Sequence, residues 1–315
     1  MSEDISYTTE EISKLLKISK LTVYDLIKKG ELASYRVGKQ MRVDASDLEA
    51  YKQRSKGMQN TRETTSRQSD MPNVTAQSND PRSIVITGQD MSLDLLARHV
   101  EKETPRYRPL RSNVGSLDSL ISMYNGHSDI VSTHLLDGDT GEYNIPYIRK
   151  LLVGTPVVVM NLLSRQAGIY VRHGNPRGIK GWNDLKQPGL RLINREKGSG
   201  ARVLLDEQLR LHGIPAHGLL GYQEEQTNHL GVAAKVAAGD ADAGVGIEKA
   251  ASIVSGVDFI PLISERYDLV ILKKAENTFL IDTIARILKS EAFQKELGSI
   301  SGYNLAQTGH ILFES

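Results

Sequence analysis

Apolar residues recur at regular spacing in two segments of the chain, and a polar stretch separates these segments. From Lys52 to Ser83 the apolar periodicity stops, and Ser, Thr, Asn, Gln and two prolines dominate. Such a stretch cannot bury enough apolar surface to offset the entropy lost on ordering. We therefore expect a small domain at residues 1–55, a flexible linker at 56–82 and a large domain at 83–315.

The small domain begins with a pattern typical of two helices that are joined by a tight turn. Thr8 or Thr9 precedes two glutamates, which predicts an N-cap with carboxylates in the first helical turn. Ile12 and the leucines after it then recur at helical spacing. A second apolar face lies within residues 20–29, and Gly30 is expected to end that helix.

A hairpin and a third helix are expected to complete the small domain. Residues 33–37 and 41–43 alternate between apolar and polar types around Gly38 and Lys39, as in two strands joined by a tight turn. Ser46 is expected to begin a helix that ends near Tyr51.

The large domain repeats an order of strand, turn and helix. The expected strands are residues 83–87, 108–114, 130–132, 191–194 and 242–247, and the expected helices are 90–100, 117–124, 201–212 and 230–238. Such alternation is typical of an α/β fold with mainly parallel strands. A β-forming stretch between Val153 and Val171 is expected to cross between two lobes, which would then share one ligand cleft.

Composition narrows the class of protein. A length of 315 residues fits two or three domains, and 39% hydrophobic with 24% charged residues is ordinary for a globular protein. The absence of cysteine excludes disulfides, thiolate metal sites and cysteine nucleophiles. The first residues lack the basic and apolar regions of a signal peptide, and no apolar run approaches the roughly 20 residues that span a bilayer. We therefore expect a cytoplasmic protein without a membrane segment.

Net charge does not by itself indicate a nucleic-acid partner. Residues 1–82 hold 14 Lys and Arg against 12 Asp and Glu, and the remainder holds 25 against 26. A prediction of DNA binding must therefore rest on where the basic side chains lie.

The small domain resembles a known DNA-binding family. The run YTTEEISKLLKISKLTVYDLIKKGELASYRVGKQMRVDASDLEAY is similar to the winged helix-turn-helix of excisionases and MerR-type regulators. In such a domain a helix enters the major groove and a basic wing contacts the DNA backbone. The candidate DNA-binding residues are Lys20, Thr22, Lys28 and Lys29 on the second helix and Arg36, Lys39, Gln40 and Arg42 on the hairpin.

The basic residues have an alternative explanation, and the size of the domain predicts an oligomer. Lysines on a short helix could alternatively be its solvated face. One such module buries only about 600–1,000 Å² of protein surface on DNA, so useful specificity predicts a homodimer or higher oligomer on a double-stranded operator.

Three loops of the large domain carry small residues and a hydroxyl at the start of a helix. They are Thr87-Gly88, Gly115-Ser116 and Gly198-Ser199-Gly200. Unpaired N–H groups and the positive end of the helix dipole attract anions at such positions. Each loop has an alternative explanation, because Gly-Ser before a helix is often only a turn with an N-cap.

The large domain resembles a family of ligand-binding proteins. The runs NVGSLDSL, SDIVSTHLLD, NREKGSGARVLLDEQL, HLGVAAKVAAGDADAGVGIEKAA and ERYDLVI are similar to the periplasmic-binding-protein-like (type II) domain related to molybdate and tungstate binding proteins. The resemblance implies a two-lobed α/β fold and an oxyanion effector, molybdate or tungstate. Backbone N–H groups and hydroxyls would bind this anion. The resemblance implies neither a required cofactor nor side chains that ligate a metal. The matching positions are Thr87, Ser116, Thr133, Ser199, Val232 and Tyr267.

Arg202 follows the third loop and is the nearest candidate cation, although it could instead pair with Asp206 one helical turn later.

Enzyme motifs are missing from the sequence. Lys and Ala stand where a nucleophile elbow around Ser199 needs glycines, and neither a phosphate-binding loop with Gly-Lys-Ser/Thr nor a His-Glu-x-x-His zinc motif occurs. The histidines stand singly, and His134 is of interest because it lies beside the expected cleft. We therefore expect no enzymatic activity.

The sequence as a whole predicts a one-component transcriptional regulator that binds operator DNA and senses a small oxyanion. Two alternatives stay open. The large domain could bind a different small anion or an organic metabolite, or the protein could be an excisionase-like architectural factor.

Overall fold

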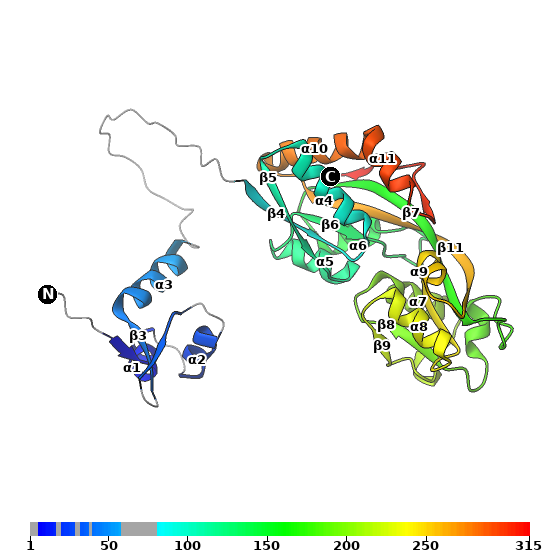
Figure 1. Ribbon diagram of the computed structural model, residues 1–315, viewed down its shortest axis with the longest axis horizontal. Coiled ribbons are helices and arrows are strands. Elements are labelled where there is room, and N and C mark those ends of the chain that lie inside the picture. Colours follow the sequence, from blue (N-terminus) through cyan, green and yellow to red (C-terminus); the bar gives the residue numbers. More distant parts are fainter. Residues whose placement is uncertain (1–5, 17–19, 29–31, 38–39, 58–80) are drawn as a thin grey trace. The chain divides into compact units, whose positions relative to one another are not determined.

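The computed structural model describes residues 6–16, 20–28, 32–37, 40–57 and 81–315. The chain divides into two compact units, Met1–Gln77 and Ser78–Ser315. Figure 1 shows the elements of both units. Most of the expected linker, at residues 58–80, lies outside the described residues.

The N-terminal unit is a small α/β domain with a three-stranded sheet in the order β1-β3-β2. Its elements are β1 (Ser6–Thr8), α1 (Thr9–Leu16), α2 (Lys20–Lys28), β2 (Tyr35–Val37), β3 (Gln40–Asp44) and α3 (Ala45–Gly57). Thr8 and Glu11 cap α1 reciprocally: the Glu11 N–H donates to Thr8 Oγ1 at 3.3 Å, and the Thr8 N–H donates to Glu11 Oε2 at 2.8 Å. The core contains Ile12, Val23, Leu32, Val43 and Leu48.

Two features of this unit differ from the sequence prediction. Strand β1 was not expected, because three residues are too few to show alternation; it pairs antiparallel with β3. Helix α3 runs to Gly57 instead of ending near Tyr51. Its last turns have a polar sequence, and Lys, Gln and Arg are good helix formers that leave no apolar period.

The C-terminal unit has two lobes joined by a pair of long strands. Strands β7 (Val157–Arg172) and β11 (Val257–Leu272) pair antiparallel along their whole length and run through both lobes (Figure 1). They lie in the centre of a ten-stranded sheet with the order β5-β4-β6-β11-β7-β10-β8-β9, and β12 and β13 also pair with β7.

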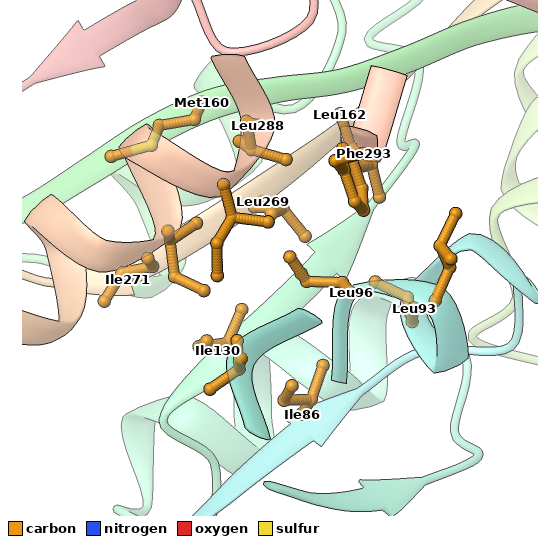
Figure 2. Close-up of a cluster of buried hydrophobic side chains, with 14 of the residues drawn as sticks. Ile86, Leu93, Leu96, Ile130, Met160, Leu162, Leu269, Ile271, Leu288 and Phe293 are labelled. Atoms are coloured by element: carbon orange, nitrogen blue, oxygen red, sulfur yellow. The ribbon is translucent and has the colours of Figure 1, made fainter. Parts of the chain in front are cut away.

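Lobe 1 combines the first and last parts of this unit. It contains β4 (Arg82–Thr87), α4 (Ser92–Glu103), β5 (Tyr107–Ser112), α5 (Ser116–Tyr124), β6 (Ile130–Thr133), α6 (Ile145–Leu151), η3 (Ala275–Asn277), α10 (Thr278–Lys289), α11 (Glu291–Gly298), β12 (Tyr303–Asn304) and β13 (Ile311–Glu314). Figure 2 shows how strands β4, β6, β7 and β11 and helices α4, α10 and α11 contribute to one buried cluster that includes Ile86, Leu96 and Phe293. This cluster fixes the loops that leave β4 and β6.

Lobe 2 contains η1 (Trp182–Lys186), β8 (Leu192–Arg195), α7 (Gly200–Leu211), η2 (Ala216–Gly218), β9 (Glu225–Gln226), α8 (His229–Ala238), β10 (Ala243–Ile247) and α9 (Glu248–Ile253). Strands β10, β8 and β9 are parallel, as are β5, β4 and β6 in lobe 1. The expectation of mainly parallel strands therefore holds within each lobe, whereas the central pair β7 and β11 is antiparallel to its neighbours.

The two lobes also make contact beyond the long strands. Leu136 and Tyr143 pack in the core of lobe 2, whereas Leu135 and Ile148 pack in lobe 1. The segment between β6 and α6 therefore forms a third connection between the lobes. No helix within the described ranges is long and apolar enough to cross a membrane.

Candidate functional site

A cavity of about 210 Å³ lies between the two lobes, where the carboxyl ends of β4, β6, β8 and β10 face each other. Ligands of open α/β sheets bind at such strand ends. Lobe 1 contributes Gln89, Asp90, Met91, His134 and Tyr303, lobe 2 contributes Arg195, Asn228, His229, Leu230, Ile247, Lys249, Ala250 and Ile253, and the long strands contribute Arg165 and Tyr267.

Arg165 on β7 is a buried cation shared between two carboxylates. It forms ion pairs with Asp90 of lobe 1 and, at 2.6 Å, with Glu265 on β11, and its guanidinium lies 4.6 Å from the centre of the Tyr267 ring. Burial opposes ionisation of Asp90, but the Arg165 charge and hydrogen bonds from Ser92 and Tyr303 hold the pKa of Asp90 below its usual value. Burial outweighs Arg165 at Glu265 and raises the pKa of that carboxyl. The charge of Arg165 is thus already compensated.

Arg195 at the end of β8 joins the lobes and keeps part of its guanidinium free. Its Nε donates to Glu196 Oε2 at 2.7 Å, and its Nη2 donates to Gln89 Oε1 of lobe 1 at 2.6 Å. Gln89 in turn donates to Glu196 Oε1 at 2.9 Å. Arg195 is only 2% exposed, and its Nη1 has no hydrogen-bond partner among the described residues.

Two histidines line the cavity in their neutral form. Burial, together with repulsion from Arg165 and Arg195, lowers the pKa of His134 and of His229 well below the usual histidine value. Ser116 Oγ accepts the backbone N–H of His134 at 3.3 Å and lies 2.9 Å from its Nδ1. Because a hydroxyl has two lone pairs and one hydrogen, this contact is compatible with hydrogen on either ring nitrogen of the neutral His134. Nδ1 of His229 is buried and has no partner within the described parts of the chain.

Lys249 is the cavity cation that lacks a carboxylate. Its ammonium lies 5.0 Å from the centre of the Tyr303 ring and contacts Met91 Sδ, and it forms no ion pair with any residue that the structure describes. Burial, with a further contribution from Arg165, lowers the pKa of Lys249, although Asp90 acts in the opposite direction. Three large apolar side chains of the cavity lining remain exposed: Met91 by 49%, Leu230 by 43% and Ile253 by 61%.

The structure distributes the predicted ligand residues over several places. Tyr267 lines the cavity, where its Oη lies 2.7 Å from Ser132 Oγ, and burial raises its pKa to about 12. Ser116 reaches the cavity through His134. Thr87 donates to the Ile130 carbonyl at 3.4 Å, and Thr133 Oγ1 is buried without a partner within the described regions.

The three predicted residues of lobe 2 have local contacts. Ser199 caps α7 and donates to the Glu196 carbonyl at 2.9 Å. Arg202 is buried and pairs with Asp206 at 3.2 Å and with Glu225 at 3.0 Å. Val232 packs in an apolar cluster under α8.

The predicted loops Gly115-Ser116 and Gly198-Ser199 come together, but they touch each other directly. The Leu117 N–H donates to the Gly198 carbonyl at 2.9 Å, and a Cβ on Gly115 would lie 2.7 Å from that oxygen. The cavity lies beside this contact.

Several residues that line the cavity were not predicted from the sequence: Asp90, Arg165, Arg195, His229, Lys249 and Tyr303. An arginine inside the apolar run at 157–172 was a usable signal for one of them.

The candidate DNA-binding residues occupy α2, β2 and β3. Lys20 and Thr22 are exposed on α2, and Lys20 pairs with Glu10 at 3.3 Å. Arg36 is exposed on β2, and Arg42 on β3 donates to Ser6 Oγ at 2.9 Å. Lys28 ends α2 and Gln40 begins β3, whereas Lys29 and Lys39 lie outside the described residues.

Known proteins match both units. A model described as a helix-turn-helix domain matches residues 6–56, and one described as a PBP superfamily domain matches residues 97–289. YvgK of Bacillus subtilis (strain 168) is 48% identical over 315 residues, which is the full length of both chains. An uncharacterized protein in the ferredoxin 2Fe-2S gene 5' region of Clostridium pasteurianum is 44% identical over 112 residues, or 36% of this chain and 99% of that one.

Solved structures agree on the fold of the C-terminal unit. PhnD1 from Prochlorococcus marinus in complex with methylphosphonate has a TM-score of 0.53 and 14% identity, over 72% of this chain and 93% of that one. A phosphate ABC transporter substrate-binding protein from Clostridium perfringens with bound phosphate has a TM-score of 0.51 and 14% identity, over 71% and 99%. The chain therefore belongs to the PBP superfamily and to the same family as YvgK, and it joins a helix-turn-helix domain to a periplasmic-binding-protein-like α/β domain.

Proposed function

We propose that this protein is a transcriptional regulator that binds double-stranded operator DNA through its N-terminal unit and a small anion in the cavity between lobes 1 and 2. One observation carries the proposal: a helix-turn-helix domain shares a chain with a ligand-binding fold whose cavity holds buried cations. As such a regulator it would act in the cytoplasm and would need no catalytic group.

The electrostatics of the cavity support an anion as the effector. Arg195 offers an unused guanidinium nitrogen among the described contacts, and Lys249 carries a charge that no described carboxylate neutralises. The helix α8 begins at the cavity with Asn228 and His229, so its free N–H groups add a positive potential there. The neutral histidines can donate without a counter-ion.

Molybdate and tungstate are the effectors that the sequence resemblance implies, and they belong first in any ligand screen. PhnD1, a fold neighbour, was solved with methylphosphonate, which adds phosphonates to that screen, and phosphate follows from the Clostridium perfringens neighbour. Because one helix-turn-helix module buries only about 600–1,000 Å² of protein surface on DNA, a homodimer on a two-half-site operator is the DNA complex that we expect.

Effector and operator would be linked thermodynamically. A ligand that changes operator affinity must have its own affinity changed by the operator to the same extent, typically by about 1–3 kcal/mol.

The test begins with thermal denaturation of the full chain in molybdate, tungstate, phosphate, sulfate and alkylphosphonates, because a ligand of the folded form raises stability. DNA duplexes selected by the full chain from a random library are then titrated with and without each stabilising anion at fixed salt. The proposal requires an anion that raises the thermal denaturation temperature and also changes the affinity for DNA. DNA affinity unchanged by every anion would favour an architectural DNA-binding factor.

A further inference from the structure

Several residues that line the cavity are apolar, and this apolar wall comes mainly from lobe 2. Ile247, Ala250 and Ile253 follow each other at a spacing of three residues along β10 and α9, and all three line the cavity. Leu230 at the start of α8 and Met91 of lobe 1 lie on the same lining. Exposed leucine and isoleucine side chains gain stability when an apolar group covers them, by about 25 cal/mol for each Å² removed from water.

The polar groups that can meet a ligand form a small set. Arg195 leaves Nη1 unused among the described contacts, and Lys249 has no carboxylate partner there. His134 and His229 are neutral and line the same cavity. These groups suit one oxyanion head group, because Arg165 and its two carboxylates already satisfy one another.

A bare tetrahedral oxyanion does not use the apolar wall. Its surface consists of oxygen atoms that accept hydrogen bonds. Contact with leucine and isoleucine side chains would remove water from these oxygens without supplying hydrogen-bond donors, which is unfavourable. The volume of about 210 Å³ also lies below the roughly 300–1,000 Å³ typical of drug-sized ligands. The cavity therefore fits a compact molecule with one polar end and one apolar end.

We propose that the effector is an organic anion with one oxyanion head group, bound by Arg195 and Lys249, and a short apolar body that lies against Leu230, Ile247 and Ile253. This inference rests on the proposed function, whose ligand class it names. Head groups of carboxylate and of phosphonate type share the required chemistry.

The experiment measures binding to the full chain by isothermal titration calorimetry. One arm uses acetate, propionate, butyrate and valerate, and a second arm uses methyl-, ethyl- and propylphosphonate. Molybdate, tungstate, sulfate and phosphate represent bare oxyanions, and butyramide is a neutral match for butyrate. Each added methylene is expected to raise affinity about four-fold until the cavity is full, since burying one contributes about 0.8 kcal/mol.

Variants separate the two ends of the ligand. Lys249→Gln is expected to weaken every anion at least ten-fold, whereas Lys274→Gln, at an exposed site of lobe 1, leaves binding unchanged. Ile253→Ser is expected to reduce, by several-fold, the total increase in affinity from the shortest to the longest member of each series. Val153→Ser is its control, because Val153 is 73% exposed and does not line the cavity.

The outcomes distinguish this inference from the proposed function. A flat affinity along both series, butyramide binding as well as butyrate, or a bare oxyanion binding more tightly than every organic anion would overturn the inference. If molybdate or tungstate alone binds and changes operator affinity, the regulator stands and the ligand class is wrong. If no anion of any class binds, the proposed function fails as well.

Discussion

Replacing Arg165 by methionine would leave two buried carboxylates without their shared cation. Asp90 and Glu265 are both almost fully buried, and each forms an ion pair with this guanidinium. Breaking a buried ion pair by removing one partner costs about 3–5 kcal/mol. Since Arg165 serves two carboxylates, we expect Arg165→Met to lower the free energy of unfolding of the C-terminal unit by at least that amount at pH 7.

The loss should shrink as pH falls. Arg165 holds the pKa of Asp90 below its unfolded value despite burial, so the stability that Asp90 contributes is present above its unfolded pKa and is lost as pH falls through the folded one. Without Arg165, burial raises the pKa of Asp90 and further raises that of Glu265, and both carboxyls become easier to protonate. The variant should therefore regain stability relative to the native chain as pH falls from 7 through the raised pKa values of the two carboxyls. Arg165→Met combined with Asp90→Asn and Glu265→Gln should recover much of the loss.

Urea denaturation, followed by tryptophan fluorescence, measures the unfolding of the C-terminal unit. Trp182 is the only tryptophan of the chain, and it is buried in lobe 2. Arg98→Met is the matched control, because the Arg98 pair with Glu296 is exposed and such pairs contribute at most about 1 kcal/mol. A loss below about 1 kcal/mol for Arg165→Met, or a loss that does not change with pH, would refute the reasoning.

Three further changes test other parts of the molecule. Ser116→Ala removes the hydroxyl that orients His134, and calorimetry with a bound anion should show weakening by about 1–3 kcal/mol with unchanged DNA affinity in the absence of ligand. Thr8→Ala removes the reciprocal cap with Glu11, and circular dichroism should show the N-terminal unit destabilised by about 1 kcal/mol. Arg36→Ala should weaken binding to all DNA sequences and reduce the salt slope in anisotropy titrations, whereas a sequence-specific loss would contradict a phosphate contact.

Much of the fold could be predicted because its signals are local. The cap at Thr8, the glycine that ends α8 and the strand–helix alternation each depend on a few neighbouring residues. Strand β11 was missed, because Pro261 and the polar run from Ser264 to Arg266 interrupt its apolar pattern. Their backbone pairs with β7, which is distant in sequence, and Arg266 also donates to Asp268 and to the Tyr143 carbonyl.

The cavity depends on contacts that no local pattern encodes. Glu265 is buried because Arg165 lies on the neighbouring strand, and Lys249 reaches Tyr303 from the other lobe. The loops at Gly115 and Gly198 were expected to face a shared ligand, and the structure joins them by a direct hydrogen bond instead. Sequence reasoning could place the loops at helix starts, but it could not tell whether a ligand or another loop would use their backbone groups.

In the proposed function, Arg195 would connect ligand binding to the arrangement of the two lobes. Its Nη2 bonds Gln89 across the cavity, and in the proposed function its Nη1 meets the anion. An anion held by Arg195 and Lys249 would therefore contact a group that already links lobe 2 to lobe 1, so occupancy would favour the arrangement of lobes in which those contacts coexist. A ligand shifts such an equilibrium only through its differential affinity for the two states. Gln89→Ala, which removes this hydrogen bond between the lobes and leaves Arg195 and Lys249 in place, should thus reduce the coupling between anion and operator more than it reduces the affinity for either alone.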